Sequence, residues 1–380
     1  MKRLSFLFKE IIYRTISIVI FTLNFPFSYF KFKTFKLNKT KIILVFSWGG
    51  LGNFIMLLPF LNALKSGFKK AEIHVLTMNK VQYDFMNALM PDINVIFMQQ
   101  KDDHIVSGVR FLASTLKGKH IDLSFHPYLE HTGRSIWWSK FVGTQFIVGF
   151  ASPTTGPWQT IRLCLKEEIS EGENYLNMLR ALKMTIPTNG KLINVKEEVK
   201  DKARAILYKH LLTSERFIGI HCGSATSCKE KRWSTHKFIK LIKMLIAAYN
   251  DLGIAVLFGP DESDLLETFS NEFNEESRVN LIKTGDFLLL CSIMEYLTLF
   301  VSNDSGLMHL ASAVGIPTIS IWGPTNTIKN RPWGDHHVTI KLGISCSPCY
   351  KIGQPITCTN RVCLDGITEE KVFNVITEKL

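Results

Sequence analysis

A loop at residues 302–313 combines residue types that bind phosphate. Its sequence, SNDSGLMHLASA, places Asn303, Asp304, Ser305 and Gly306 at the end of a predicted strand, with His309 about one helical turn beyond Ser305. A hydroxyl and backbone amides at a helix start attract anions, and a histidine on the same face can reach the same phosphate. An isolated histidine near a helix start is more often structural. The clustering of these residue types favours a phosphate-binding loop.

A second loop, HCGSATSCKEKRWS at residues 221–234, carries basic side chains. Ser224 follows a predicted strand, Lys229 and Lys231 come later in the loop, and Ser234 has the character of a helix N-cap. Backbone amides together with a flexible ammonium group can hold a pyrophosphate. The alternative is a solvated basic loop without a ligand.

A third loop, SWGGLGN at residues 47–53, contains Gly49, Gly50, Gly52 and Asn53. Glycines let the backbone approach a ligand closely, and the helix that follows begins with a positive dipole end. The spacing differs from the dinucleotide-binding GxGxxG pattern, and a plain tight turn is the alternative.

The elements that carry these loops alternate between strand and helix. In the first half, buried-type strands are predicted within residues 42–47, 72–78, 93–98, 121–127 and 145–150. In the second half they are predicted within residues 217–223, 254–260, 279–285, 298–304 and 317–323. Such alternation predicts an α/β protein with two doubly wound parallel sheets, whose ligands bind at the carboxyl ends of the strands.

The same pattern divides the chain into four parts: a leader at 1–40, domains at 41–190 and 191–345, and a cysteine-containing loop with a C-terminal helix at 346–380. We expect that last helix, within residues 367–380, to pack back across the domains.

The leader carries most of the basic charge. The chain has a net charge of +12, of which residues 1–41 contribute +8. An uncharged stretch of sixteen residues lies between Arg14 and Lys31. This is shorter than the ~20 residues of a spanning helix, and Pro26 interrupts it. Aromatic and aliphatic residues flanked by lysines favour a segment lying on an anionic membrane surface. The alternatives are a short helix docked on the protein itself and a true membrane span. The mildly basic remainder argues against a nucleic-acid partner.

Four cysteines near the C-terminus are separated by gaps of two, eight and four residues: Cys346, Cys349, Cys358 and Cys363. Two pairs of thiols in a short loop can bind a structural zinc ion. Disulfides and plain thiols are the alternatives, and disulfides are disfavoured on a cytoplasmic face.

The motifs together resemble glycosyltransferase family 9, the lipopolysaccharide heptosyltransferases. The resemblance runs from about Lys41 to Leu380 and rests on GGLGNFIMLLPFLNALK, the KEKRW loop, FGPDES and SNDSGLMHLASAVGIPTISIWGPT. It implies a GT-B fold of two Rossmann-like, doubly wound domains facing a central cleft. It also implies an acceptor on the N-terminal domain, a nucleotide-sugar such as ADP-heptose on the C-terminal domain, and inverting transfer that needs no metal.

Carried over by position, the resemblance implies that Ser305, Gly306 and His309 hold the diphosphate. Lys231, or its neighbour Lys229, would neutralise the leaving group. Ser224 belongs to the same donor loop, Glu262 would bind the ribose hydroxyls, and Asp304 would lie near the sugar. The backbone at Lys283–Phe287 would cradle the base.

One position departs from the family pattern. Members with heptosyl transfer carry an aspartate where this chain has Asn53, and that aspartate is proposed to deprotonate the acceptor. An amide cannot act as a general base. Either another group serves, with Glu130, His126 and His131 in the next acceptor-facing loop as candidates, or little base assistance is needed, or the protein binds without catalysing.

These observations predict a peripheral enzyme at the cytoplasmic face of the inner membrane, moving a sugar from a nucleotide donor to a lipid-linked saccharide such as lipopolysaccharide core. A nucleotide-sugar epimerase of the same fold and a catalytically weak sugar-nucleotide-binding protein are the alternatives.

Overall fold

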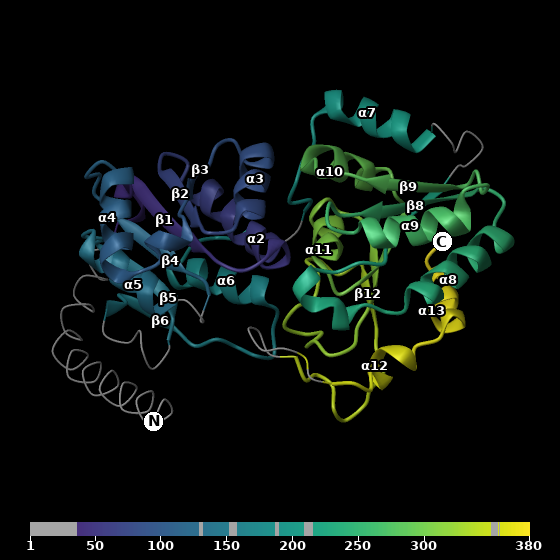
Figure 1. The fold of residues 1–380 in the computed structure, drawn as a ribbon. Helices are drawn as coiled ribbons and strands as arrows, with labels where there is room; N and C mark the ends of the chain where they lie inside the picture. Colours follow the sequence, from purple (N-terminus) through teal and green to yellow (C-terminus); the bar gives the residue numbers. More distant parts are fainter. Residues whose placement is uncertain are drawn as a thin grey trace. The chain divides into compact units, whose positions relative to one another are not determined.

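The computed structural model describes residues 36–128, 132–151, 158–186, 190–208, 216–350, 356 and 358–380. Contacts divide the chain into two compact units, Met1–Pro187 and Thr188–Leu380. Each unit contains one parallel sheet of six strands (Figure 1).

The sheet of the first unit has the strand order β3-β2-β1-β4-β5-β6. In β1, Val45 pairs with Val75 on one side and with Phe125 on the other. Five of the six residues of β1 are buried, as in strands covered by helices on both faces. The strands are β1 (Ile42–Ser47), β2 (Glu72–Thr77), β3 (Asn94–Phe97), β4 (Leu123–His126), β5 (Phe146–Phe150) and β6 (Ile161–Leu163).

The helices of this unit fall into two groups. The strand order reverses between β1 and β4, so right-handed crossovers place the helices before and after this point on opposite faces. Accordingly α2 packs against α3 and α6, whereas α4 packs against α5. The helices are α2 (Leu51–Gly67), α3 (Lys80–Leu89), α4 (Ile105–Thr115), α5 (Thr132–Phe141) and α6 (Glu171–Ala181), with short 3-10 turns η1 (Leu37–Lys39) and η2 (Gln100–Asp102).

The second unit repeats this plan with the order β12-β11-β10-β7-β8-β9. Its order reverses between β7 and β10. The strands are β7 (Arg216–His221), β8 (Leu252–Phe258), β9 (Val279–Lys283), β10 (Leu299–Asn303), β11 (Thr318–Ile321) and β12 (His337–Ile340).

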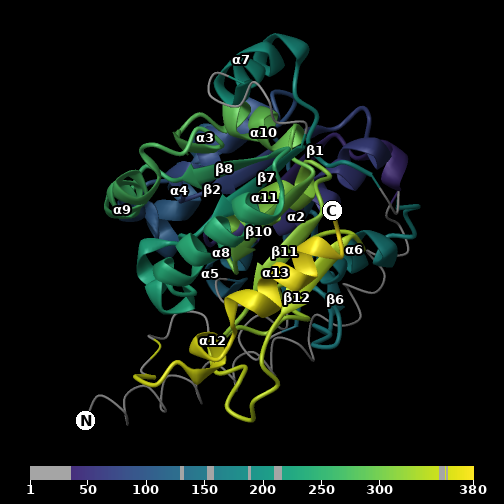
Figure 2. The same ribbon diagram turned by 90° about the vertical axis from the view of Figure 1, so that its right-hand side faces the viewer.

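Its helices also form two groups by contact, with α8 touching α9 and α13, and α10 touching α7 and α11. They are α7 (Glu197–Tyr208), α8 (Thr235–Ala248), α9 (Ser263–Phe273), α10 (Phe287–Glu295), α11 (Gly306–Ala313), α12 (Val362–Asp365) and α13 (Glu369–Thr377), with the 3-10 turn η4 (Thr226–Lys231). The C-terminal helix α13 packs on α8 and buries Val372 and Ile376 in the core of this unit (Figure 2).

The predicted fold class, with two doubly wound α/β domains, is confirmed. The ten predicted strands are present, but the edge strands β6 and β12 were not predicted. Most of their residues are only half-buried, so neither forms the continuous apolar run that marks the inner strands.

Candidate active site

Three loops of the second unit begin at neighbouring strand ends. β7 and β10 are adjacent at the reversal of strand order, and β8 lies beside β7. Ligands of doubly wound sheets bind at such a switch point. The two loops predicted to bind phosphate, after β7 and β10, therefore lie together, and the β8–α9 loop brings Glu262 to them.

Asn303 fixes the spacing of these loops. Its side-chain NH2 donates to the backbone oxygens of Cys222 and Gly223 at 2.8 and 3.1 Å, and its oxygen accepts from the Trp233 amide at 2.8 Å. The side chain is fully buried. Asn303 thus ties the end of β10 to the end of β7 and to the segment leading into α8.

Lys231 and Asp304 form an ion pair beside the start of α11. Lys231 Nζ lies 3.0 Å from Asp304 Oδ2 and 4.2 Å from the centre of the Tyr350 ring. The two side chains are only 13% and 8% exposed. A partly buried ammonium group at this place can stabilise negative charge on a departing diphosphate. Of the two lysines named from the sequence, Lys231 makes this pair, whereas Lys229 is exposed.

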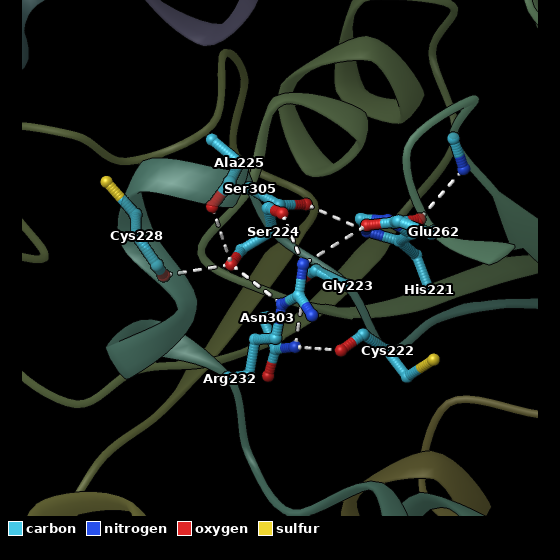
Figure 3. Close-up of polar contacts among 11 residues, drawn as sticks. His221, Cys222, Gly223, Ser224, Ala225, Cys228, Arg232, Glu262, Asn303 and Ser305 are labelled. Atoms are coloured by element: carbon cyan, nitrogen blue, oxygen red, sulfur yellow. Dashed lines mark hydrogen bonds and ion pairs between the residues drawn. The ribbon is translucent and has the colours of Figure 1, made fainter. Parts of the chain in front are cut away.

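His221 connects Ser305 to Glu262 (Figure 3). Its Nδ1 lies 3.1 Å from Ser305 Oγ, and its Nε2 lies 3.2 and 3.3 Å from the carboxylate oxygens of Glu262. All three residues are buried, with exposed fractions of 3% for His221, 8% for Ser305 and 6% for Glu262. Ser305 is also the N-cap residue of α11.

The Glu262 carboxylate is held from several sides. It accepts from the Gly259 amide at 2.8 Å and lies 3.8 Å from an Arg232 nitrogen. Burial raises its pKa, but the hydrogen bond and charge of His221, with the Gly259 amide and Arg232, outweigh burial and hold the pKa below its ordinary value. A Cβ at Gly223 would lie 1.7 Å from Glu262 Oε1, so only glycine fits there with this carboxylate.

His309 lies in α11 with its side chain buried. Burial lowers the pKa of its imidazole to about 4, so the ring is neutral at physiological pH. Among the described residues, no side-chain or backbone group hydrogen-bonds to this ring. A neutral imidazole can still donate one hydrogen bond to a phosphate.

Ser224 forms hydrogen bonds within the loop after β7. Its hydroxyl donates to the backbone oxygen of Cys228 at 2.9 Å and accepts from Arg232 Nε at 3.1 Å, and Arg232 also donates to the Ser224 carbonyl at 2.8 Å. The segment Lys283–Phe287 connects the last residue of β9, which pairs with β8, to the first residue of α10, and Asp286 caps that helix. The contacts of Ser224 and of this segment to a nucleotide stay predictions.

In the first unit, a buried glutamine organises the glycine-rich loop. Gln82 Nε2 donates to the carbonyls of Gly49 at 2.9 Å and Gly50 at 3.2 Å, while its oxygen accepts from the hydroxyls of Ser47 and Thr77 at 2.8 Å each. Asn79 adds a further hydrogen bond to the Gly49 carbonyl at 3.0 Å. Because Gly49 has φ +89°, the loop needs glycine there.

Asn53 lies in the first turn of α2, next to this loop. A Cβ built on Gly49 would lie 3.1 Å from the Asn53 side chain, and the Tyr128 hydroxyl donates to the Asn53 backbone oxygen at 3.2 Å. Gly50 is the N-cap residue of α2, and Gly52 lies within its first turn.

A cavity of about 270 Å³ opens beside the loop, close to the lower end of small-molecule sites at ~300 Å³. It contains an ion pair between Arg134 and Asp103. Its lining residues are Ser47, Trp48, Gly49, Met78, Asn79, Asp103, Arg134 and Trp138.

His126 is a core residue, which corrects its expected place in an acceptor-facing loop. It ends β4 and is 1% exposed. Its ring contacts the hydroxyls of Ser124, Ser135 and Ser139 at 2.9 to 3.2 Å and stacks on Phe46 with centroids 4.6 Å apart. Burial lowers the pKa of the imidazole to about 3. We therefore do not retain His126 as a candidate base.

Glu130 and His131 lie outside the described residues, as does the leader through residue 35. Within the part of the chain that the structure describes, no helix is both long enough and apolar enough to span a membrane.

The four C-terminal cysteines are free thiols that line one small cavity of about 20 Å³. No three histidine, cysteine, aspartate or glutamate side chains among the described residues are grouped closely enough to hold a metal ion. Burial and the neighbouring thiols Cys349, Cys346 and Cys358 raise the pKa of Cys363. The disulfide interpretation of this cluster does not agree with the structure.

A model of glycosyltransferase family 9 (heptosyltransferase) matches residues 128–359. The chain belongs to glycosyltransferase family 9. This family 9 chain is 26% identical over 169 residues to lipooligosaccharide heptosyltransferase 2 of Campylobacter jejuni, an alignment covering 44% of this chain and 52% of the relative. The chain thus spans about half the length of that curated relative.

Solved structures resemble the family 9 chain over most of its length. A family 9 glycosyltransferase from Veillonella parvula aligns with a TM-score of 0.72 at 23% identity, covering 91% of this chain and 98% of the other. The E. coli ADP-heptose lipopolysaccharide heptosyltransferase II aligns with a TM-score of 0.67 at 20% identity, covering 89% and 98%. At these identities the likeness shows the fold, which is of the GT-B type.

The residues of the site that were not predicted from the sequence include His221, Gln82 and Asp103. The loop carbonyl that Gln82 binds lies 33 residues away along the chain, and the Ser305 partner of His221 lies 84 residues away, so local spacing gives no sign of them. The sequence offered one signal each for His221 and Gln82. His221 lies at the end of a predicted strand, and Gln82 is a polar residue on the face of α3 that also carries the buried Phe85 and Met86.

Proposed function

We propose that this protein is an inverting, metal-independent glycosyltransferase that moves a heptose or related sugar from a nucleotide-sugar to a lipid-linked saccharide. Family membership supports glycosyl transfer. ADP-heptose is the donor we expect, because the similar E. coli protein is an ADP-heptose lipopolysaccharide heptosyltransferase. A saccharide of the lipopolysaccharide core is the acceptor we expect, because the Campylobacter relative is named a lipooligosaccharide heptosyltransferase.

The observation that carries the proposal is the cluster at the ends of β7 and β10. The start of α11 offers unpaired backbone amides. Beside it lie the Ser305 hydroxyl and the Lys231 ammonium group, whose partners among the described residues are Asp304 and a tyrosine ring. These groups can stabilise the charge that develops on a diphosphate as its bond to the sugar breaks.

In the proposed reaction the acceptor oxygen attacks the anomeric carbon from the face opposite the diphosphate. The carbon–oxygen bond to the diphosphate breaks, its electron pair leaves with the nucleoside diphosphate, and the configuration is inverted. The acceptor proton passes to a base. Lys231 acts mainly on the leaving group, because its charge is most useful when negative charge accumulates there.

Two carboxylates are candidates for the base. Glu130 is the candidate from the sequence. Asp103 is a candidate from the structure, because it lines the same cavity as Gly49 and is partly exposed. Asn53 would then orient the acceptor hydroxyl by hydrogen bonding.

The leader supports a peripheral location at the cytoplasmic face of the inner membrane. Its cationic and aromatic residues suit an anionic surface, and a lipid-linked acceptor is confined to such a surface.

The direct test incubates the purified chain with ADP-heptose and a truncated lipopolysaccharide acceptor, and follows ADP release and the mass of the acceptor. We expect ADP release that depends on the acceptor. Release of free sugar or an epimer without acceptor would indicate the epimerase alternative. Binding of ADP-heptose without any turnover would indicate a binding protein.

Structural zinc at Cys346, Cys349, Cys358 and Cys363 stays a separate prediction. All four thiols line one cavity, but no three of them are grouped closely enough in the described structure to hold a metal ion, so zinc binding would require the thiols to move together. Metal analysis of the reduced protein tests it: zinc that falls in Cys349→Ser, and not in the control Cys164→Ser, would support the site. Equal zinc content in both variants would contradict it.

A further inference from the structure

His221 lies between the residues proposed for the two ends of the nucleotide, Ser305 for the diphosphate and Glu262 for the ribose. Both ring nitrogens are engaged, Nδ1 with Ser305 Oγ and Nε2 with the Glu262 carboxylate (Figure 3). The ring is 3% exposed. Its protonation state therefore decides which atoms its two neighbours can present to a ligand.

The hydrogen atoms in this chain of contacts can be counted. Glu262 is ionised, because its pKa is held below its ordinary value, and an ionised carboxylate only accepts. Nε2 of His221 must therefore carry a hydrogen, since two lone pairs would otherwise face each other at 3.2 Å. In a neutral ring Nδ1 is then an acceptor, and the Ser305 hydroxyl must donate to it.

This arrangement is unsuitable for binding phosphate. The oxygens of a diphosphate at neutral pH are acceptors, and Ser305 has only one hydroxyl hydrogen. While that hydrogen points at His221, the hydroxyl presents lone pairs to the phosphate. A second proton on the ring reverses the contact, because Nδ1 then donates to Ser305 Oγ and frees the hydroxyl hydrogen for the phosphate.

We propose that His221 is a positioning residue of the donor site and is doubly protonated when a nucleoside diphosphate is bound, so that Ser305 donates to the phosphate. The inference rests on the proposed function, because Ser305 must be a phosphate contact. His221 does not itself touch the ligand; it acts through Ser305 and holds Glu262 at the other end.

The surrounding charges are consistent with proton uptake on binding. The charged groups nearest His221 are Glu262, in contact with Nε2, and Arg232, which lies 3.8 Å from Glu262. Lys231 and Asp304 compensate each other. Burial raises the pKa of Cys222 to about 12 and lowers that of His309 to about 4, so both are neutral. A bound diphosphate adds negative charge and shifts this balance toward the second proton.

Binding of ADP to the full chain tests the inference. Calorimetric titrations in buffers of different ionisation enthalpy count protons taken up, from about pH 5 to about pH 9, the range in which histidines titrate. We expect uptake of up to about one proton per ADP, and an affinity that falls up to about tenfold per pH unit on the alkaline side. ADP also titrates, so each variant is compared with the wild type.

His221→Asn should abolish the proton uptake that exceeds the contribution of ADP itself. An amide NH2 near the position of Nδ1 can donate to Ser305 without an added proton. Ser305→Ala should abolish this uptake as well and should lower ADP affinity, which provides a second test if His221→Asn folds poorly. The exposed His236→Asn on α8 is the matched control and should keep the wild-type proton uptake.

Tight ADP binding without proton uptake in the wild type would overturn the role of His221 and leave the proposed function standing. So would uptake that is unchanged in His221→Asn. Failure of the wild type to bind ADP, with the fold intact, would overturn the adenine-nucleotide donor proposal and this inference together.

Discussion

The side chain of Asn53 lies against Gly49, at the point where the glycine-rich loop enters α2. Asparagine and aspartate have nearly the same shape, so the substitution Asn53→Asp should fit the same space. What it changes is the ability to accept a proton. A substitution at this position therefore tests whether another residue acts as the general base.

We expect Asn53→Asp to fold normally and to leave single-turnover transfer unchanged or slower, because in the proposed mechanism another carboxylate serves as base. Glu130→Gln and Asp103→Asn should identify it, since loss of a positioned base costs ~10²–10⁴-fold. A faster Asn53→Asp enzyme with a new carboxylate-dependent pH profile would show instead that no replacement base exists.

The ion pair of Lys231 with Asp304 allows a second prediction about single residues. Lys231→Ala should reduce kcat more than it weakens ADP binding, because the ammonium charge is most useful in the transition state. Lys229→Ala, which removes an exposed lysine of the same loop, should have the smaller effect. Equal effects on kcat would contradict the assignment to Lys231.

At the scale of elements, α3 holds the glycine-rich loop through the side chain of Gln82. Gln82 is fully buried and joins the loop to the ends of β1 and β2. The donor-side loops are held in a similar way by Asn303. In each unit one buried amide side chain replaces the missing regular hydrogen bonds of a loop backbone.

Gln82→Leu should therefore lower the free energy of unfolding by about 1–3 kcal/mol per polar group left unpaired. It should also raise KM for the acceptor, while ADP binding changes little. Urea unfolding and separate titrations of the two substrates measure these effects, with the exposed Val81→Ala as control. A variant as stable as the wild type would mean that water replaces the hydrogen bonds that Gln82 makes to the loop.

The inner strands and the order of the loops could be predicted from the sequence, because buried parallel strands are continuous apolar runs followed by polar or glycine-rich turns. The same signal fails for β6 and β12, whose side chains are only partly covered. His126 lies within the strand predicted at residues 121–127 but was also named as a candidate base, because the sequence does not show that the hydroxyls of Ser124, Ser135 and Ser139 surround its ring. Contacts such as His221 with Glu262 depend on tertiary structure that spacing does not encode.

At the scale of the whole molecule, the asymmetry of charge gives a prediction about location. Deleting residues 1–38 should release the protein from anionic vesicles and leave ADP binding intact, because the residues proposed to bind the nucleotide lie in the second unit. High salt should weaken vesicle binding only in part, since apolar burial is not screened. Equal vesicle binding with and without residues 1–38 would contradict a membrane role for the leader.

The absence of a side chain at Gly223 has a consequence for how this family can diverge. Because a single added carbon would occupy the place of a Glu262 oxygen, positions 223 and 262 are not free to change independently. Homologues with alanine or serine at the first position should carry a shorter or uncharged residue at the second. With the ribose role proposed for Glu262, such chains would be expected to hold the donor's ribose by other groups, so this pair offers a two-residue marker for how family members bind that sugar.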